Sequence, residues 1–184
     1  EVNVTRKILA RDYLKHLLSK HVMDSMKDWK FLHDDNDDNA KIDEYWIFFT
    51  HFMTLNYTPK KADILSCMKR GAAIICRQNE WGIDLIIPMI RKSAAAAEGE
   101  TVQVDDVTFI LISVKNYKAG QKKRDFDASS TYKMNPCYVG IVKDLNELEL
   151  PYITLYIDVG CPEVRFSTCK MNDEKRDTNN STPD

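Results

Sequence analysis

Short apolar runs separated by turns, from residue 72 onward, limit the folds that this chain can adopt. They read "AAIICR", "IDLIIPMI" and "VTFILISVKN", and a further strong run, "YITLYIDVG", begins at residue 152. Runs of this length that are rich in Ile and Leu are typical of strands buried in a sheet. "QNEWG" joins the first two runs as a turn, with Asn79 and Gly82 as its flexible residues. We expect a mixed sheet, with "PCYVGIV" as a candidate short strand.

Helical spacing dominates before residue 71. From about Thr5 to Leu32, apolar residues recur at intervals typical of one long helix or two short ones. The dense aromatic run "IDEYWIFFTHFMTL" predicts a buried helix. "NYTPKKADILSCMKRG" predicts a well-marked helix, because Thr58 can cap it, Pro59 suits its first position and Gly71 can end it. "KSAAAAEGETVQ" predicts a loop, with a short helix at its alanines as the alternative.

The order of these segments predicts an α/β fold in which helices are followed by a central mixed β-sheet. The chain has 184 residues, 43% of them hydrophobic, which is enough for one compact core and short for two. We therefore expect a single domain over residues 1–170 and a polar, flexible tail over residues 171–184. The first residue is Glu, so we also expect a piece of a longer protein.

Composition argues against several classes of protein. The formal net charge of −2 excludes a wholesale polycation, although a local basic stretch can still bind phosphate. The five cysteines form no CxxC pair, which argues against zinc and favours reduced thiols in a nuclear or cytoplasmic protein. A secreted effector is the alternative, because a piece of a longer chain can lack its signal. No stretch reaches the roughly 18 apolar residues of a membrane span, so we expect no membrane association.

Polar residues interrupt two of the apolar runs. Asp84 stands in "GIDLIIPM", and Ser113 and Lys115 end "FILISVK". An isolated buried charge is costly, so each of these residues needs a partner or a task. Ser113 and Lys115 are two apart and therefore share one face of their strand. If the two strands pair, a carboxylate, a hydroxyl and an ammonium converge at one end of the sheet, which suits Mg²⁺ and a phosphodiester.

The two segments resemble the PD-(D/E)XK nuclease superfamily. In its restriction-endonuclease-like fold, an Asp on the second core strand and an acid-x-Lys pair on the third bind Mg²⁺ and cleave DNA. The longer pattern from "RGAAIICRQNEWGIDLIIPM" to "FILISVKN" is similar to fungal proteins, some of them allied to Crinkler-type and related effector or mobile-element proteins. The resemblance covers residues from about 44 to 117. It implies a DNA nuclease with Mg²⁺ or Mn²⁺ as its cofactor.

By position, the resemblance assigns metal binding to Asp84 and the motif lysine to Lys115. Ser113 stands where the superfamily usually has Glu, Asp or sometimes Gln, and a hydroxyl is a weaker metal ligand than a carboxylate. Either another carboxylate completes the site, or the domain keeps the fold and no longer cuts. The superfamily often adds a Glu from its first helix, which makes Glu44 the first candidate for a metal-binding carboxylate. Glu80, in the turn, is the second candidate.

A basic segment, "KNYKAGQKKRD", follows the candidate site. It carries four residues suited to a DNA backbone, Lys118, Lys122, Lys123 and Arg124. A solvated basic loop is the plainer interpretation of the same residues. We predict a Mg²⁺-dependent DNA endonuclease-like domain. The first alternative is an inactive nuclease-fold module that binds nucleic acid, a protein partner or a second copy of itself. The second is a structural domain in which Asp84 and Lys115 form a partly buried ion pair.

Overall fold

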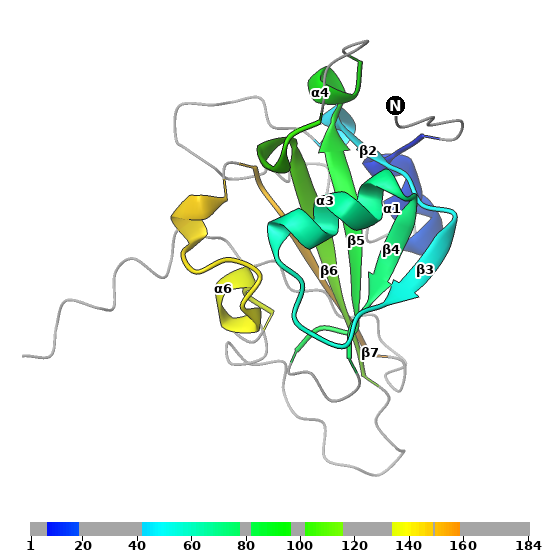
Figure 1. The fold of residues 1–184 in the computed structure, drawn as a ribbon. Helices are drawn as coiled ribbons and strands as arrows, with labels where there is room; N and C mark the ends of the chain where they lie inside the picture. Colours follow the sequence, from blue (N-terminus) through cyan, green and yellow to red (C-terminus); the bar gives the residue numbers. More distant parts are fainter. Residues whose placement is uncertain are drawn as a thin grey trace, which may run out of the picture.

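The computed structural model describes residues 7–18, 42–77, 82–96, 102–115, 134–148 and 150–158. Within these residues, a mixed sheet of seven strands lies between a helix on one face and a second helix on the other (Figure 1). The α/β class and the mixed sheet expected from the sequence are therefore confirmed. No helix in the described part of the chain is long and apolar enough to cross a membrane.

The centre of the sheet is β5 (Leu85–Arg91). On one edge it pairs antiparallel with β6 (Val107–Lys115), and β6 pairs parallel with β7 (Ile153–Asp158). The other edge of β5 is shared. Its first residues pair with β4 (Ala72–Ile75) and its last residues pair with β2 (Tyr45–Ile47), both antiparallel. The start of β5 therefore lies between the ends of β4 and β6.

Two further strands widen the sheet. β3 (His51–Thr54) runs parallel to β4, and β1 (Ile8–Leu9) pairs antiparallel with β2. The strands at residues 72–75, 85–91, 107–115 and 153–158 correspond to the four apolar runs from which the sheet was predicted. Their continuous apolar character has a simple cause, because the central strands are covered on both faces.

The two faces have separate apolar cores because side chains alternate along each strand. Phe109 and Leu111 of β6 pack with α3 (Lys61–Lys69), and we call this side the α3 face. The intervening residues Ile110 and Ile112 pack with α1 (Ala10–Leu17), on the α1 face. Figure 1 shows α3 crossing the sheet, with α1 on the opposite side.

Helix α3 begins and ends for local reasons. It was expected from the sequence, although its start is later than the Thr58 and Pro59 signals indicate. The carboxylate of Asp63 accepts the backbone N–H of Lys60 at 2.9 Å, which caps the first turn. At the other end Gly71 has φ +68°, and a Cβ there would lie 2.9 Å from the Phe48 ring. Glycine is therefore required to end α3 and let the chain enter β4.

The prediction of a helix over "IDEYWIFFTHFMTL" is wrong. The chain instead forms a short 3₁₀ turn, η1 (Ile42–Glu44), followed by β2 and β3. Tyr45 and Ile47 are buried while Trp46 is only partly buried, which is the alternation of a strand. Aromatic and β-branched residues fit a pleated surface well, so the density of aromatic side chains indicated burial without indicating a helix.

The strand expected over "PCYVGIV" is also wrong, because α6 (Pro136–Val139) occupies its first residues. The side chain of Asn135 accepts the backbone N–H of Cys137 at 2.8 Å, and Pro136 stands at the first helical position. Gly140 then ends the turn with φ +85°. These are start and stop signals of a helix, and they outweigh the apolar residues between them.

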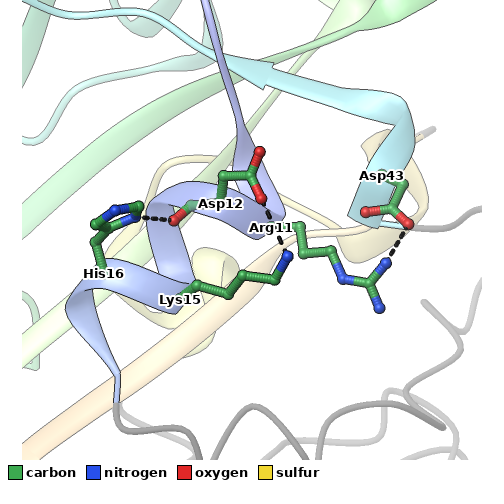
Figure 2. Close-up of polar contacts among 5 residues, drawn as sticks. All are labelled: Arg11, Asp12, Lys15, His16 and Asp43. Atoms are coloured by element: carbon green, nitrogen blue, oxygen red, sulfur yellow. Dashed lines mark hydrogen bonds and ion pairs between the residues drawn. The ribbon is translucent and has the colours of Figure 1, made fainter.

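One long helix or two short ones were expected from Thr5 to Leu32. α1 (Ala10–Leu17) lies within this range, and residues 19–41 lie outside the described residues. Figure 2 shows how its polar side is held. Arg11 contacts the carboxylate of Asp43 in η1 at 2.6 Å, and Lys15 contacts Asp12 at 3.2 Å. α4 (Lys92–Ala96) is the short helix that the alanines allowed. Two 3₁₀ turns, η2 (Val104–Asp106) and η3 (Leu145–Glu147), are the remaining elements of the described residues. The tail at residues 171–184 lies outside the description.

Candidate functional site

Asp84 is held by its backbone between two strands. It stands directly before β5, where its N–H donates to the carbonyl of Ile112 at 2.8 Å. Its own carbonyl accepts the N–H of Cys76, just after β4, at 3.0 Å. Hydrogen bonds on both sides restrict the backbone of Asp84, so the position of its Cβ at this end of the sheet is well defined.

The Asp84 carboxylate gathers the other two predicted residues around one oxygen. Its Oδ2 accepts the backbone N–H of Val114 at 2.6 Å and a long hydrogen bond from the Ser113 hydroxyl at 3.4 Å. The ammonium nitrogen of Lys115 lies 3.9 Å from the same oxygen. The structure therefore brings together Asp84, Ser113 and Lys115, as the pairing of the two strands predicted.

Exposure separates these residues into two kinds. Ser113 is 1% exposed, whereas the side chains of Asp84 and Lys115 are 47% and 38% exposed. The expectation of a buried charge in this strand is thus wrong, because Asp84 precedes the strand and Lys115 ends its neighbour. A half-exposed ion pair contributes at most about 1 kcal/mol to stability. The stability of the fold alone therefore does little to explain this ion pair, although the Asp84 carboxylate also accepts the N–H of Val114.

The register extends this cluster into a row across the sheet. Leu85 pairs with Ile112, so Asp84 comes beside Ser113, and Ser113 in turn pairs with Tyr156 of β7. Ser113 and Lys115 continue the alternation of Phe109 and Leu111, which places them on the α3 face. The candidate site is therefore the end of the α3 face where β4 and β6 finish and β5 begins.

The donor atoms present suit a metal ion only in part. Among the described residues, no group of three or more His, Cys, Asp and Glu side chains could hold a metal. Asp84 supplies one carboxylate, and Mg²⁺ keeps several waters and often takes only one or two protein carboxylates together with substrate phosphates. Within the described residues, Asp84 therefore offers a single carboxylate and the site forms no closed cage for a metal ion.

Glu44 does not join this site. It directly precedes Tyr45, which pairs with Arg91 at the last residue of β5, whereas Asp84 precedes the first. The length of β5 separates the two carboxyl-bearing residues by about 20 Å at the usual rise of a strand. Glu44 therefore cannot complete a metal site with Asp84. Glu80 and the basic residues Lys118, Lys122, Lys123 and Arg124 lie outside the described residues.

Residues that the sequence did not single out stand at the same end of the sheet. Arg77 is exposed and follows Cys76, whose N–H bonds the Asp84 carbonyl. Tyr156 is the register partner of Ser113, and Asp158, the last residue of β7, is the register partner of Lys115. Their positions depend on pairing between distant segments, so no local pattern could have indicated them.

The thiols offer little chemistry of their own. Within the described residues, the cysteines are Cys67, Cys76 and Cys137. Cys67 and Cys76 are buried in the core of the α3 face. Burial raises the pKa of the Cys67 thiol above its usual value, so this thiol stays protonated at neutral pH and is a poor nucleophile.

A substitution of Ser113 tests the metal-binding capacity of this cluster. In Ser113→Asp, a second carboxylate would lie beside Asp84 in a buried position, so we expect the free energy of unfolding to fall by about 1–3 kcal/mol without metal. Added Mg²⁺ or Mn²⁺ should restore stability by binding both carboxylates. The measurement is the melting temperature with and without each ion.

The control for this variant is Ser113→Asn, which has nearly the same shape and no charge. We expect metal to raise the melting temperature of Ser113→Asp by several degrees and to leave Ser113→Asn unchanged. Equal responses of the two variants would show that metal does not bind at Ser113 and Asp84.

Comparisons with known proteins bear on the family of the chain. No curated protein matches it, and no solved structure matches it. One family model, described as a domain of unknown function (DUF8736), matches residues 5–182. This match covers α1, α3 and the strands that carry the candidate site. The chain belongs to the DUF8736 family.

Proposed function

We propose that the chain is a metal-dependent DNA nuclease domain of restriction-endonuclease-like fold. The observation that carries the proposal is the distance of 3.9 Å between the Asp84 carboxylate and the Lys115 ammonium at a half-exposed end of the sheet. The strand order supports it. In the antiparallel run β4, β5, β6, Asp84 directly precedes the second strand, and Ser113 and Lys115 end the third. This is the placement of the catalytic residues in the superfamily that the sequence resembles.

Asp84 and Lys115 have distinct roles in this proposal. Asp84 offers one carboxylate to a divalent cation, and the hydrogen bond from Val114 fixes its orientation. Lys115 supplies a compact positive charge that can hold the attacking water or offset charge that develops on the phosphate. A bound Mg²⁺ or Mn²⁺ would supply Lewis-acid polarisation of the phosphate. Ser113 acts on Asp84 through its hydroxyl and is too buried to reach a substrate directly.

Positive charge near this end suits a nucleic-acid backbone. Arg77 is exposed there, and the basic segment at residues 118–124 follows Lys115 in the sequence. Contacts of this kind add affinity that falls with salt and carries no sequence information. We further propose a nuclear or cytoplasmic fungal protein, with a secreted effector as the alternative.

The second candidate function is a nuclease-fold module that binds nucleic acid or protein without cutting. Ser113 favours it, because this position usually holds Glu, Asp or sometimes Gln in the superfamily that the sequence resembles. Asp84 supplies a single carboxylate, so substrate and water must complete the coordination of the metal ion. This lowers the affinity of the site for the ion when no substrate is bound. Cleavage activity separates the two candidates.

The test is cleavage of plasmid and single-stranded DNA with Mg²⁺ or Mn²⁺, and with EDTA as the metal-free reference. We expect cutting that EDTA abolishes and that Lys115→Ala lowers by about 100-fold, because one positioned charge at the phosphate is lost. Lys15→Ala is the matched control, since Lys15 is also half-exposed and also pairs with an aspartate. If the folded wild type does not cut with either ion, the enzyme proposal fails and the binding module takes its place.

A further inference from the structure

Tyr156 flanks Ser113 on the side opposite to Asp84. β6 lies between β5 and β7, and the register pairs Ser113 with Tyr156 in the same row that brings Asp84 beside Ser113. Adjacent strands are about 4.8 Å apart, so Tyr156 stands about 10 Å from Asp84 at the backbone. An aromatic residue therefore borders the candidate site, two strands away from Asp84.

Alternation along β7 determines the face on which Tyr156 lies. Ile153 and Leu155 are buried in the core of the α1 face. Tyr152 packs on the α3 face, where its ring lies 6.0 Å from that of Phe109. Tyr156 is four residues further along the strand and shares that face. It is partly exposed, so its ring is on the side of the sheet that carries Asp84, Ser113 and Lys115.

The neighbours of Tyr156 differ from those of Tyr152. Deep in the sheet, the ring of Tyr152 meets the large side chain of Phe109. At the end of the sheet the corresponding partner is Ser113, and the next residue in the row is Asp84. Both have short side chains, so the ring of Tyr156 is the largest group in this part of the row.

We propose that Tyr156 is a stacking platform for an unpaired nucleobase whose phosphate lies at Asp84 and Lys115, so that the substrate class is single-stranded DNA. The inference rests on the proposed function for the position of the phosphate. Aromatic side chains stack on any base, and this contact is sequence-tolerant. A base within a duplex is already stacked and paired, so it is not available to the ring. Tyr156 therefore distinguishes single-stranded from double-stranded DNA and does not recognise a particular base sequence.

The test is equilibrium binding of a labelled single-stranded oligonucleotide and of its duplex, measured by fluorescence anisotropy with Ca²⁺ or EDTA in place of Mg²⁺. Tyr156→Leu should weaken single-strand binding by about 10-fold or more, from the usual strength of base stacking, and leave duplex binding unchanged. Tyr156→Phe and Tyr156→Trp keep an aromatic face and should bind as the wild type does. Phe52→Leu is the control, since Phe52 is 51% exposed and lies against Phe49 on the other face.

Several results would overturn the inference. The first is that Tyr156→Leu binds single strands as tightly as the wild type, and the second is that it loses the same affinity for single strands and for duplex. The third is that Tyr156→Trp loses as much single-strand affinity as Tyr156→Leu. The fourth is that the wild type does not bind single strands. The binding assay needs no cleavage. A protein that binds as expected but does not cut would contradict the nuclease alone, and one that cuts while Tyr156→Leu binds normally would contradict the platform alone.

Discussion

Asp84→Asn is expected to lower metal-dependent cleavage by about 100-fold or more while the protein stays folded. The amide oxygen of Asn can still accept the N–H of Val114, which Asp84 accepts at 2.6 Å, so the local geometry is retained. The negative charge is lost, and with it the carboxylate that Mg²⁺ requires. A 100-fold loss corresponds to about 2.7 kcal/mol of transition-state stabilisation, which is within the range expected for metal-assisted phosphate chemistry. The measurement is the rate of cleavage of single-stranded DNA and of plasmid at saturating Mg²⁺ and Mn²⁺.

A matched control separates catalysis from the loss of an ion pair. Asp43 is 41% exposed and pairs with Arg11 (Figure 2). In the same way, Asp84 is 47% exposed and pairs with Lys115. Asp43→Asn should leave cleavage unchanged, and each substitution should change the free energy of unfolding by about 1 kcal/mol or less. Equal cleavage by Asp84→Asn and the wild type would remove Asp84 from the metal site and leave it as a partner for the N–H of Val114.

The strands could be predicted because their signal is local. Residues 85–91 and 107–115 are covered on both faces of the sheet, so each segment is an almost continuous apolar run. Each strand can therefore be recognised from its own sequence. The segment at residues 42–55 could not be assigned in the same way. Its strands are short, and they are strands because β5 and β4 offer them open edges. Pairing between distant segments overrode the helical interpretation of the aromatic residues.

The residues of the candidate site also differ in whether the sequence could predict them. Asp84, Ser113 and Lys115 could be brought together from the sequence because consecutive antiparallel strands place the start of one beside the end of the next. The error for Glu44 arose because the sequence does not say which end of β5 receives β2. Tyr156 was missed because β7 joins β6 in parallel after a long connection, and its register depends on the whole fold.

Phe109→Ala is expected to lower the free energy of unfolding by about 3–5 kcal/mol. Phe109 is 1% exposed, and it lies in β6 between the core under α3 and the ring of Tyr152. Its loss would leave a cavity beneath the strand that carries Ser113 and Lys115. A domain of this size typically has only 5–15 kcal/mol of stability, so the loss is a large part of the total. The measurement is urea-induced unfolding followed by circular dichroism.

Phe52→Ala removes the same side chain from another strand and is the control for this prediction. Phe52 is 51% exposed and touches Phe49 with ring centroids 5.4 Å apart, so its loss should cost only about 1 kcal/mol. The difference between the two variants isolates burial, because the residue type and the substitution are the same. Equal costs for the two would contradict the burial of Phe109 in the core between β6 and α3. They would also remove the support on which the convergence of Asp84 and Lys115 depends, since both residues are positioned by the pairing of β5 with β6.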